Sequence, residues 1–349
     1  MCSRAAYLNA GTLGPLPRRS GEATARWARR LVEEGRSSKA LFEELLALRE
    51  RVRAMIRALL NAPEGSIALT TATTDGCNIV VTGLGIGPGD EVVTTDSEHP
   101  GLFGALVASG ATLRIANIRE RSAGDALALL EEQIGEGTRL IALSHVSWLT
   151  GAVLPIRELA GRGIPLLVDG AQAAGAIPVD VTELGCDFYT VSAQKWLLGP
   201  EATGALFVRP DRIEELRMTF PSYLSWQFPD YVPKPDATRF DPGWIPAGSL
   251  AGLEESLTFA TGAGPSRFPH AREMTERCRE LLTAAQVAVV TEPGQATLVT
   301  WPAEEPERVA EKLANAGVVV RDLPGTGWVR ASCGFWTSEE DLERLIRAI

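Results

Sequence analysis

Lys195 is the residue of this sequence with the clearest chemical use, because it follows FYTVS, an apolar run typical of a buried strand. Burial disfavours the charged ammonium group and lowers the pKa of a lysine. A lysine with a lowered pKa can form a Schiff base with an aldehyde, the attachment that pyridoxal phosphate (PLP) requires. From position alone, a lysine at a sheet edge with its ammonium group in solvent is the more common case. The assignment therefore depends on the residues around it.

Asp169 is the first of these residues. It ends the apolar run PLLVD, and ligands of open α/β sheets bind at the carboxyl ends of the strands. A carboxylate there can keep a pyridine nitrogen protonated, which lets the cofactor ring stabilise a carbanion at the α-carbon of a substrate. Gln172, three residues later, suits a hydrogen bond to the ring oxygen. An aspartate that caps the following helix is the simpler alternative, but in company with Lys195 the carboxylate favours a PLP site.

Further polar residues suit the phosphate group and the face of the ring. Thr73 and Thr74 follow the run SIALT and open an apolar helix, so their backbone N–H groups and hydroxyls would face an anion. A plain threonine N-cap has the same appearance. Ser192 and Gln194 precede the lysine and would add phosphate donors. His99, in TTDSEHPG at another strand end, is placed to stack on the cofactor ring.

Seven short apolar runs predict the sheet that would position these residues. Because they alternate with helical or glycine-rich segments, the sheet should be mostly parallel and covered on both faces, which is an α/β fold. Ahead of the first run, apolar residues spaced by three or four over 41–59 predict an amphipathic helix. The seven runs are SIALT, EVVTT, TLRIAN, RLIALS, PLLVD, FYTVS and GALFV.

The chain is predicted to divide into three parts. Residues 1–20 form an N-terminal arm, residues 21–245 a large PLP-binding domain, and residues 246–349 a smaller α+β domain of ordinary size. The segment 220–245, rich in Pro, Trp and Tyr, is predicted to be an ordered loop that crosses between the two domains.

Composition excludes several other classes. The 34 basic and 44 acidic residues give a net charge of −10, which would repel nucleic acid. The five cysteines are scattered without a CxxC pair, which predicts a reducing cytoplasmic location and no structural zinc. No stretch reaches the length of a membrane span. The remaining histidines, His145 in LSHVSW and His270 in a predicted surface turn, are interpreted as structural.

The motifs ATTDG, EHPG, VDGAQ and SAQK, in this order and spacing, resemble the class V aminotransferase family of PLP enzymes, which includes cysteine desulfurases. The resemblance implies the aspartate-aminotransferase-like fold, known as PLP fold type I, and a homodimer with its active site at the interface. It implies that Lys195 carries the cofactor, Asp169 pairs with the pyridinium, Gln172 contacts the ring oxygen and His99 stacks on the ring. The positions that match the phosphate site are Thr73, Thr74, Ser192 and Gln194.

Within the family, YLNAGTLGPLP, SHVSWLTGAVLP and VRASCGFWTSEED look most like cystine and cysteine C–S lyases. Arg330 matches the arginine that holds the α-carboxylate of the substrate, and Arg321 matches a second arginine suited to the distal carboxylate of cystine. A surface salt bridge is the alternative for Arg321. Trp148 stands near the ring where desulfurases have Asn, a feature that it shares with the lyases.

Two further positions depart from the family pattern: Gln194 stands where desulfurases usually have a His, and Trp244 stands where many relatives have a Thr that reaches the phosphate of the partner subunit. Desulfurases also carry a nucleophilic thiol before the carboxylate-binding arginine. Here that interval, RDLPGTGWVR, has no cysteine, and Cys333 is predicted to be buried packing. We therefore expect β-elimination of sulfur to pyruvate, ammonia and a thiol or persulfide. Transamination, epimerisation and desulfuration remain alternatives, as does a non-catalytic PLP-fold binding module.

Overall fold

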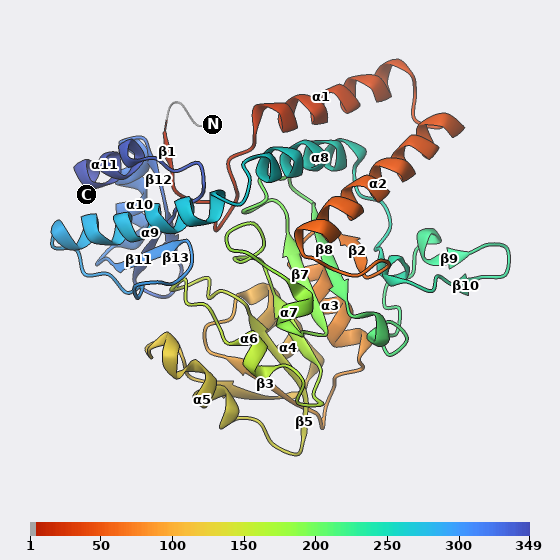
Figure 1. Cartoon of the computed structure of the whole chain (residues 1–349), viewed down its shortest axis with the longest axis horizontal. Helices are drawn as coiled ribbons and strands as arrows, with labels where there is room; N and C mark the ends of the chain where they lie inside the picture. The colour runs from red at the N-terminus through yellow and green to blue at the C-terminus, as the bar shows by residue number, and fades with distance from the viewer. Residues whose placement is uncertain (1–4) are drawn as a thin grey trace.

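The computed structural model describes residues 5–349 and has a seven-stranded sheet at its centre (Figure 1). The strand order is β2-β8-β7-β6-β5-β3-β4, and β8 runs antiparallel to both its neighbours while the remaining pairs are parallel. Each of the seven predicted runs is a strand of this sheet, which confirms the predicted mostly parallel α/β fold. The strands are β2 (Ile67–Thr70), β3 (Glu91–Thr95), β4 (Thr112–Ala116), β5 (Thr138–Ser144), β6 (Leu166–Asp169), β7 (Phe188–Ser192) and β8 (Gly204–Val208).

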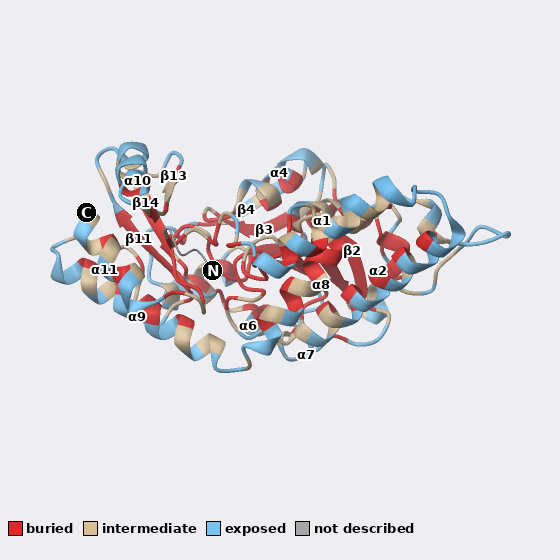
Figure 2. Ribbon diagram, turned by 90° about the horizontal axis from the view of Figure 1, so that it is seen from above, coloured by how far each residue is buried: buried red, intermediate tan, exposed pale blue. Residues whose placement is uncertain are grey.

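Four strands are buried along their whole length because both faces of the sheet are covered. These strands are β2, β6, β7 and β8, and the two faces of the sheet pack into separate hydrophobic clusters. Figure 2 shows the buried residues in red at the centre of the molecule, between helices with exposed outer surfaces. Helices α3 (Thr73–Gly83) and α4 (Pro100–Ser109) directly follow β2 and β3 and so place their first turns at the carboxyl edge of the sheet. The shorter helices of this unit are α5 (Ala126–Glu131), α6 (Ile156–Leu159) and α7 (Val181–Leu184).

Three long helices cover one side of the sheet: α1 (Arg18–Glu33), α2 (Lys39–Leu59) and α8 (Ala247–Gly262). Helix α2 is the predicted amphipathic helix and begins two residues earlier than predicted, because Ser38 caps it by accepting from the N–H of Leu41 at 3.2 Å. Helix α8 lies in the range that the sequence assigns to the small domain. Its buried leucines nevertheless belong to the core of the large domain, where they pack against α1 and α2.

Segment 220–245 does not cross to the small domain, contrary to the prediction. It forms the hairpin β9 (Trp226–Gln227) and β10 (Val232–Pro233), which projects from the end of the molecule opposite the small domain (Figure 1). A buried ion pair holds it to the large domain, because a carboxylate oxygen of Asp241 lies 2.7 Å from a guanidinium nitrogen of Arg49 and both side chains are 2% exposed. The Pro-rich composition indicated irregular, ordered structure but not its direction.

The C-terminal part is a small α+β unit with a three-stranded antiparallel sheet, β11-β14-β13. The N-terminal arm joins it, because β1 (Ala6–Tyr7) pairs in parallel with β12 (Val318–Val319). His270 lies in α9 rather than in a surface turn, and its Nε2 donates to the carbonyl of Thr337 at 3.0 Å. The other elements are α9 (Arg267–Ala284), β11 (Leu298–Pro302), α10 (Pro306–Asn315), β13 (Arg321–Leu323), β14 (Trp328–Ser332) and α11 (Glu339–Ala348). No helix within residues 5–349 is both long enough and apolar enough to span a membrane.

Candidate active site

Lys195 lies in the turn that follows β7, close to the end of β6, where Asp169 is the last residue. Burial of the ammonium group lowers the pKa of Lys195 to about 8, although the carboxylate of Asp169 acts in the opposite direction. Among the described residues the ammonium group forms no hydrogen bond or ion pair. At pH 7 about a tenth of this lysine is therefore an uncharged nucleophile, far more than for an exposed lysine.

Asp169 is 2% exposed, and one of its oxygens accepts from the N–H of Ala171 at 2.9 Å. No helix begins here, so this contact closes a turn and is not the helix cap considered as the alternative, and it occupies only one oxygen. Burial raises the pKa of Asp169, and the positive charge of Lys195 opposes this shift. A buried carboxylate without an ion-pair partner among residues 5–349 is suited to a cationic ligand such as a pyridinium.

The residues predicted to hold a phosphate group gather at the N-terminus of α3. The backbone N–H of Thr73 donates to Oγ of Ser192 at 3.1 Å, and this hydroxyl lies 3.3 Å from Oγ1 of Thr73. Oγ1 of Thr74 lies against the first turn of α4, where a Cβ added to Gly101 would come within 2.6 Å of it. The side-chain carbonyl oxygen of Gln194 is buried without a hydrogen-bond partner. Two helix N-termini therefore meet here, and the positive ends of their dipoles suit an anion.

His99 is the N-cap of α4, and its Nδ1 accepts from the N–H of Gly101 at 3.0 Å. Its proton is therefore on Nε2 when the ring is neutral. Burial, reinforced by the charges of Lys195 and Arg330, lowers the pKa of His99 to about 4, so the imidazole is uncharged near neutrality. Its ring meets that of Trp148 edge to face at 5.2 Å. His99 offers an uncharged aromatic face to the site.

Arg330 comes from β14 and is 1% exposed. Its Nη1 donates to the carbonyl of Trp148 at 2.6 Å, whereas its Nε is buried without a partner. Burial lowers the pKa of Arg330 to about 9, and the charge of Arg321 contributes to this shift. Arg321 lies directly opposite Arg330 in the β13–β14 pair, so both side chains leave the same face of the sheet. Neither arginine forms an ion pair within residues 5–349, and this arrangement is typical of an anion site.

Gln172 and Trp148 complete the predicted set. The Oε1 atom of Gln172 accepts from the indole N–H of Trp196 at 2.9 Å, and its Nε2 atom donates to the carbonyl of Gly11 at 2.8 Å. One N–H of the amide remains for a ligand. The indole N–H of Trp148 is buried and has no acceptor.

Three further residues take part in the site and were not predicted: Trp196, Gly11 and Glu98. Trp196 and Gly11 hold Gln172, and the only available signal was their place beside SAQK and inside YLNAGTLGP. Glu98, directly before His99, is buried and accepts hydrogen bonds from the N–H of Ser144 at 2.9 Å and from its hydroxyl. Burial raises the pKa of Glu98 to about 7. A glutamate at a strand end beside a candidate histidine was visible in the sequence.

The model of the family described as "Aminotransferase class-V" matches residues 15–345. The chain belongs to this family. Isopenicillin N epimerase of Streptomyces clavuligerus is 31% identical to it over 98% of this chain and 93% of its own length. A probable cysteine desulfurase of Halalkalibacterium halodurans is 29% identical over 86% of this chain and 80% of the relative. Membership confirms the predicted family, its fold and PLP as the cofactor.

Solved structures agree with this assignment. The cystine C–S lyase C-DES, in complex with its reaction product cysteine persulfide, matches with a TM-score of 0.93 and 28% identity over 99% of this chain and 97% of that chain. A C-DES mutant with glycine covalently linked to its PLP cofactor matches with a TM-score of 0.92 and 29% identity over 99% of this chain and 96% of that chain.

The side chains of this class V enzyme fit PLP on structural grounds of their own. Buried N–H donors without partners, in Trp148 and Arg330, lie on the segments that carry the site, and the ammonium group of Lys195 has no partner among the described residues. Asp169 suits the ring nitrogen and the N-termini of α3 and α4 suit the phosphate.

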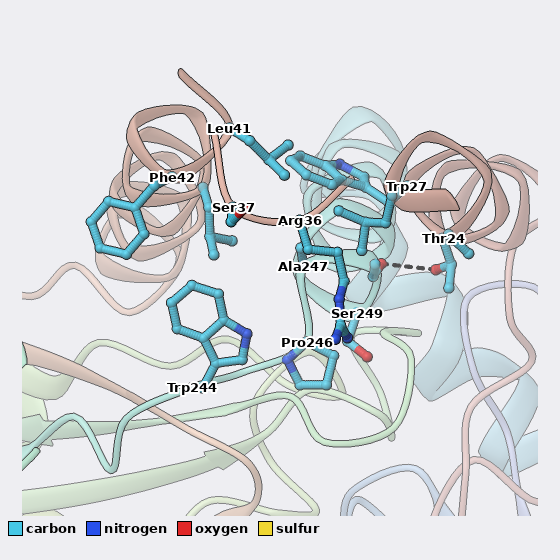
Figure 3. A pocket seen from close by; sticks show the side chains of 14 residues that line it. Thr24, Trp27, Arg36, Ser37, Leu41, Phe42, Trp244, Pro246, Ala247 and Ser249 are labelled. Carbon is cyan, nitrogen blue, oxygen red and sulfur yellow. Dashed lines mark hydrogen bonds between the residues drawn. The ribbon is translucent and has the colours of Figure 1, made fainter. Parts of the chain in front are cut away.

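A separate apolar pocket of about 710 Å³ lies between α1, α2 and residues 244–249 (Figure 3). None of the candidate site residues lines it. Trp244 is 53% exposed there and stacks on Phe42 with 6.1 Å between ring centres. Within one chain, Trp244 is thus part of an open aromatic surface rather than of the lysine site.

Proposed function

We propose that this chain is a PLP-dependent carbon–sulfur lyase that removes sulfur from the β-carbon of cysteine, cystine or an S-substituted cysteine. The observation that carries the proposal is the burial of the four described cysteines, which are Cys77, Cys186, Cys278 and Cys333. Cys2 lies outside the described residues. Because residues 5–349 offer no mobile thiol to accept sulfur, we infer that the sulfur leaves with the product.

Cys333, the cysteine nearest to Arg330 in the sequence, is 0% exposed. Its neighbour Cys278 and its burial raise the pKa of this thiol well above the usual range, so it stays protonated. Its backbone N–H donates to the carbonyl of Thr297, which holds it beside β11. A buried, protonated thiol on a strand end cannot swing to a substrate as a nucleophile must.

The roles of the other residues follow from their contacts. PLP supplies an aldehyde for the substrate amine and a ring that stabilises negative charge at the α-carbon. Lys195, once free, takes the proton from the α-carbon, because its pKa of about 8 suits a base near neutrality. Asp169 keeps the ring nitrogen protonated. Arg330 holds the α-carboxylate.

The balance is that of an elimination followed by hydrolysis. The proton leaves the α-carbon, the bond between the β-carbon and sulfur breaks with its electron pair on sulfur, and the sulfur takes up a proton. For cystine, one molecule of water is consumed and the products are pyruvate, ammonia and cysteine persulfide. No oxidant or reductant is needed. The same sequence on cysteine releases hydrogen sulfide.

The two arginines favour a dicarboxylic substrate. Arg321 and Arg330 face one another across β13 and β14 without an ion-pair partner among residues 5–349. One carboxylate on Arg330 would leave the second positive charge unbalanced, whereas cystine brings two carboxylates. A guanidinium group binds a carboxylate through two parallel hydrogen bonds.

The test is product analysis with cysteine, cystine and S-methylcysteine. We expect pyruvate and ammonia in equal amounts, together with sulfide, persulfide or methanethiol, and no product from Lys195→Ala. Alanine as the product would contradict the lyase, since alanine arises when sulfur is transferred to an enzyme thiol and the carbon skeleton is retained.

Epimerisation is the second candidate, and the likeness to isopenicillin N epimerase over nearly the whole chain favours it. It shares removal of the α-proton and then returns a proton to the opposite face without breaking a bond to sulfur. In D₂O, an epimerase would place deuterium on the α-carbon of a recovered, inverted amino acid. A lyase would consume the amino acid instead.

We also propose a homodimer. The exposed aromatic surface of Trp244 and Phe42 borders the apolar pocket of Figure 3, and an exposed apolar surface of this kind is unfavourable in water. A single species of monomer mass in light scattering at micromolar concentration would contradict this proposal.

A further inference from the structure

We propose that Trp196 is a positioning residue for the cofactor: it fixes the amide of Gln172 so that an N–H, and not the carbonyl, faces the ring oxygen of PLP. The inference rests on the PLP site of the proposed function. Trp196 directly follows Lys195 in the sequence and is not among the predicted site residues.

The amide of Gln172 has two polar partners that admit one orientation only. An indole N–H donates and never accepts, and it lies 2.9 Å from Oε1. A backbone carbonyl accepts and never donates, and that of Gly11 lies 2.8 Å from Nε2. If the amide turned over, the NH₂ group would face the indole N–H and two carbonyl oxygens would meet. Both hydrogen bonds would be lost in a buried place, where unpaired polar groups are strongly unfavourable.

The orientation matters because the two ends of the amide have opposite effects on the ring. The remaining N–H of Gln172 stabilises negative charge on the ring oxygen, whereas a carbonyl oxygen in its place would repel that charge. Gln172 lies three residues after Asp169, on the turn that begins at the end of β6. The same turn therefore carries the partner of the ring nitrogen and the partner of the ring oxygen.

Trp196 is itself held firmly. It is 1% exposed and packs on Trp336 of the small unit, with 6.2 Å between the ring centres. Its backbone packs closely on Gly175: a Cβ added at Gly175 would lie only 2.9 Å from the carbonyl of Trp196, so there is no room for a side chain between them. Because Trp196 directly follows Lys195, one rigid turn places both the attachment point of the cofactor and the group that orients its ring donor.

The experiment removes only the indole N–H. Trp196→Phe keeps an aromatic ring at this position, and the cofactor bound to Lys195 reports on the ring oxygen through the pH dependence of its visible absorption. Loss of one hydrogen bond to a charged oxygen should raise the pKa of this absorption by about one unit. Gln172→Leu should give the same rise, and the double variant should rise no further than Gln172→Leu alone.

Trp336→Phe is the matched control, because Trp336 touches the same indole but makes no hydrogen bond to Gln172. It should leave the pKa of the absorption unchanged. If Trp196→Phe fails to fold, 3-benzothienylalanine at position 196 keeps the shape of tryptophan without its N–H donor and should give the same rise.

Two results would overturn the inference. In the first, Gln172→Leu raises the pKa of the absorption while the Trp196 variants leave it at the wild-type value. In the second, the shifts of the single variants add in the double variant, which would mean that Trp196 acts independently of Gln172. Failure of the wild type to bind PLP would overturn the proposed function instead, and comparison of wild type with variants separates the two cases.

Discussion

Substitution of Arg321 tests whether the substrate has one carboxylate or two, because only a second carboxylate would bind this arginine. Arg321 is half-buried and lies opposite the fully buried Arg330. Loss of an exposed charge pair costs about 0–1 kcal/mol, and loss of one member of a desolvated pair costs about 2–5 kcal/mol. For a half-buried guanidinium group we expect a loss between these two cases, about 2 kcal/mol of binding free energy in the transition state. This corresponds to roughly a 30-fold decrease in kcat/KM. Arg321→Ala should therefore reduce kcat/KM for cystine by this factor.

The assay compares cystine with S-methylcysteine, because their ratio cancels general damage to the protein. S-methylcysteine has no distal carboxylate, so Arg321→Ala should leave its kcat/KM near the wild-type value. Removal of the charge of Arg321 also relieves the repulsion that lowers the pKa of Arg330, so Arg330 stays protonated. Arg330→Ala should weaken both substrates alike.

Asp322→Asn is the matched control, because successive side chains of a strand point to opposite faces and Asp322 therefore faces away from Arg330. Its ratio of cystine to S-methylcysteine should equal that of the wild type. An unchanged ratio in Arg321→Ala as well would refute the assignment of a distal carboxylate site to Arg321.

Three further predictions concern the remaining site residues. Burial lowers the pKa of Lys195 to about 8, so the uncharged fraction of this lysine grows as pH rises to that value. The rate at which PLP attaches to the cofactor-free protein, measured by stopped-flow absorption, should therefore increase about tenfold per pH unit below pH 8 and level off above it. A rate independent of pH would contradict the lowered pKa. Asp169→Asn should still bind PLP but lose at least 100-fold in kcat, because the neutral amide no longer holds the ring nitrogen protonated. Turnover near the wild-type value would mean that Asp169 serves only to hold its own turn. Cys333→Ala should still release pyruvate from cystine, and loss of pyruvate formation in a variant that retains its fold and bound PLP would refute a thiol-free reaction.

The sequence was most informative where function depends on the ends of strands. Lys195, Asp169 and Ser192 were found because each follows an apolar run, and runs of a parallel sheet bring their carboxyl ends to one edge. The contacts of Gln172 were not predictable, since its two partners come from Trp196 and from the arm at Gly11. Such contacts join positions that no local pattern relates.

Contacts between residues far apart in the sequence also explain why segment 220–245 and helix α8 were assigned incorrectly. Segment 220–245 has the composition of a connection, but the direction of a connection is set by what it packs on, here Arg49 against Asp241. Helix α8 is apolar on most of its surface, so its sequence did not reveal which of the two cores would receive it. Only the long-range contact with α1 decides this.

The N-terminal arm has a consequence for how movements of the small unit reach the cofactor site. Ala6 pairs with β12, and the N–H of Gly11 donates to Oγ of Ser332 at 3.1 Å, more than three hundred residues later. The carbonyl of the same Gly11 accepts from Nε2 of Gln172 at 2.8 Å, on the turn after β6. A single residue of the arm is therefore bonded to both units, so a shift of the small unit against the sheet would stretch the hydrogen bond that orients Gln172.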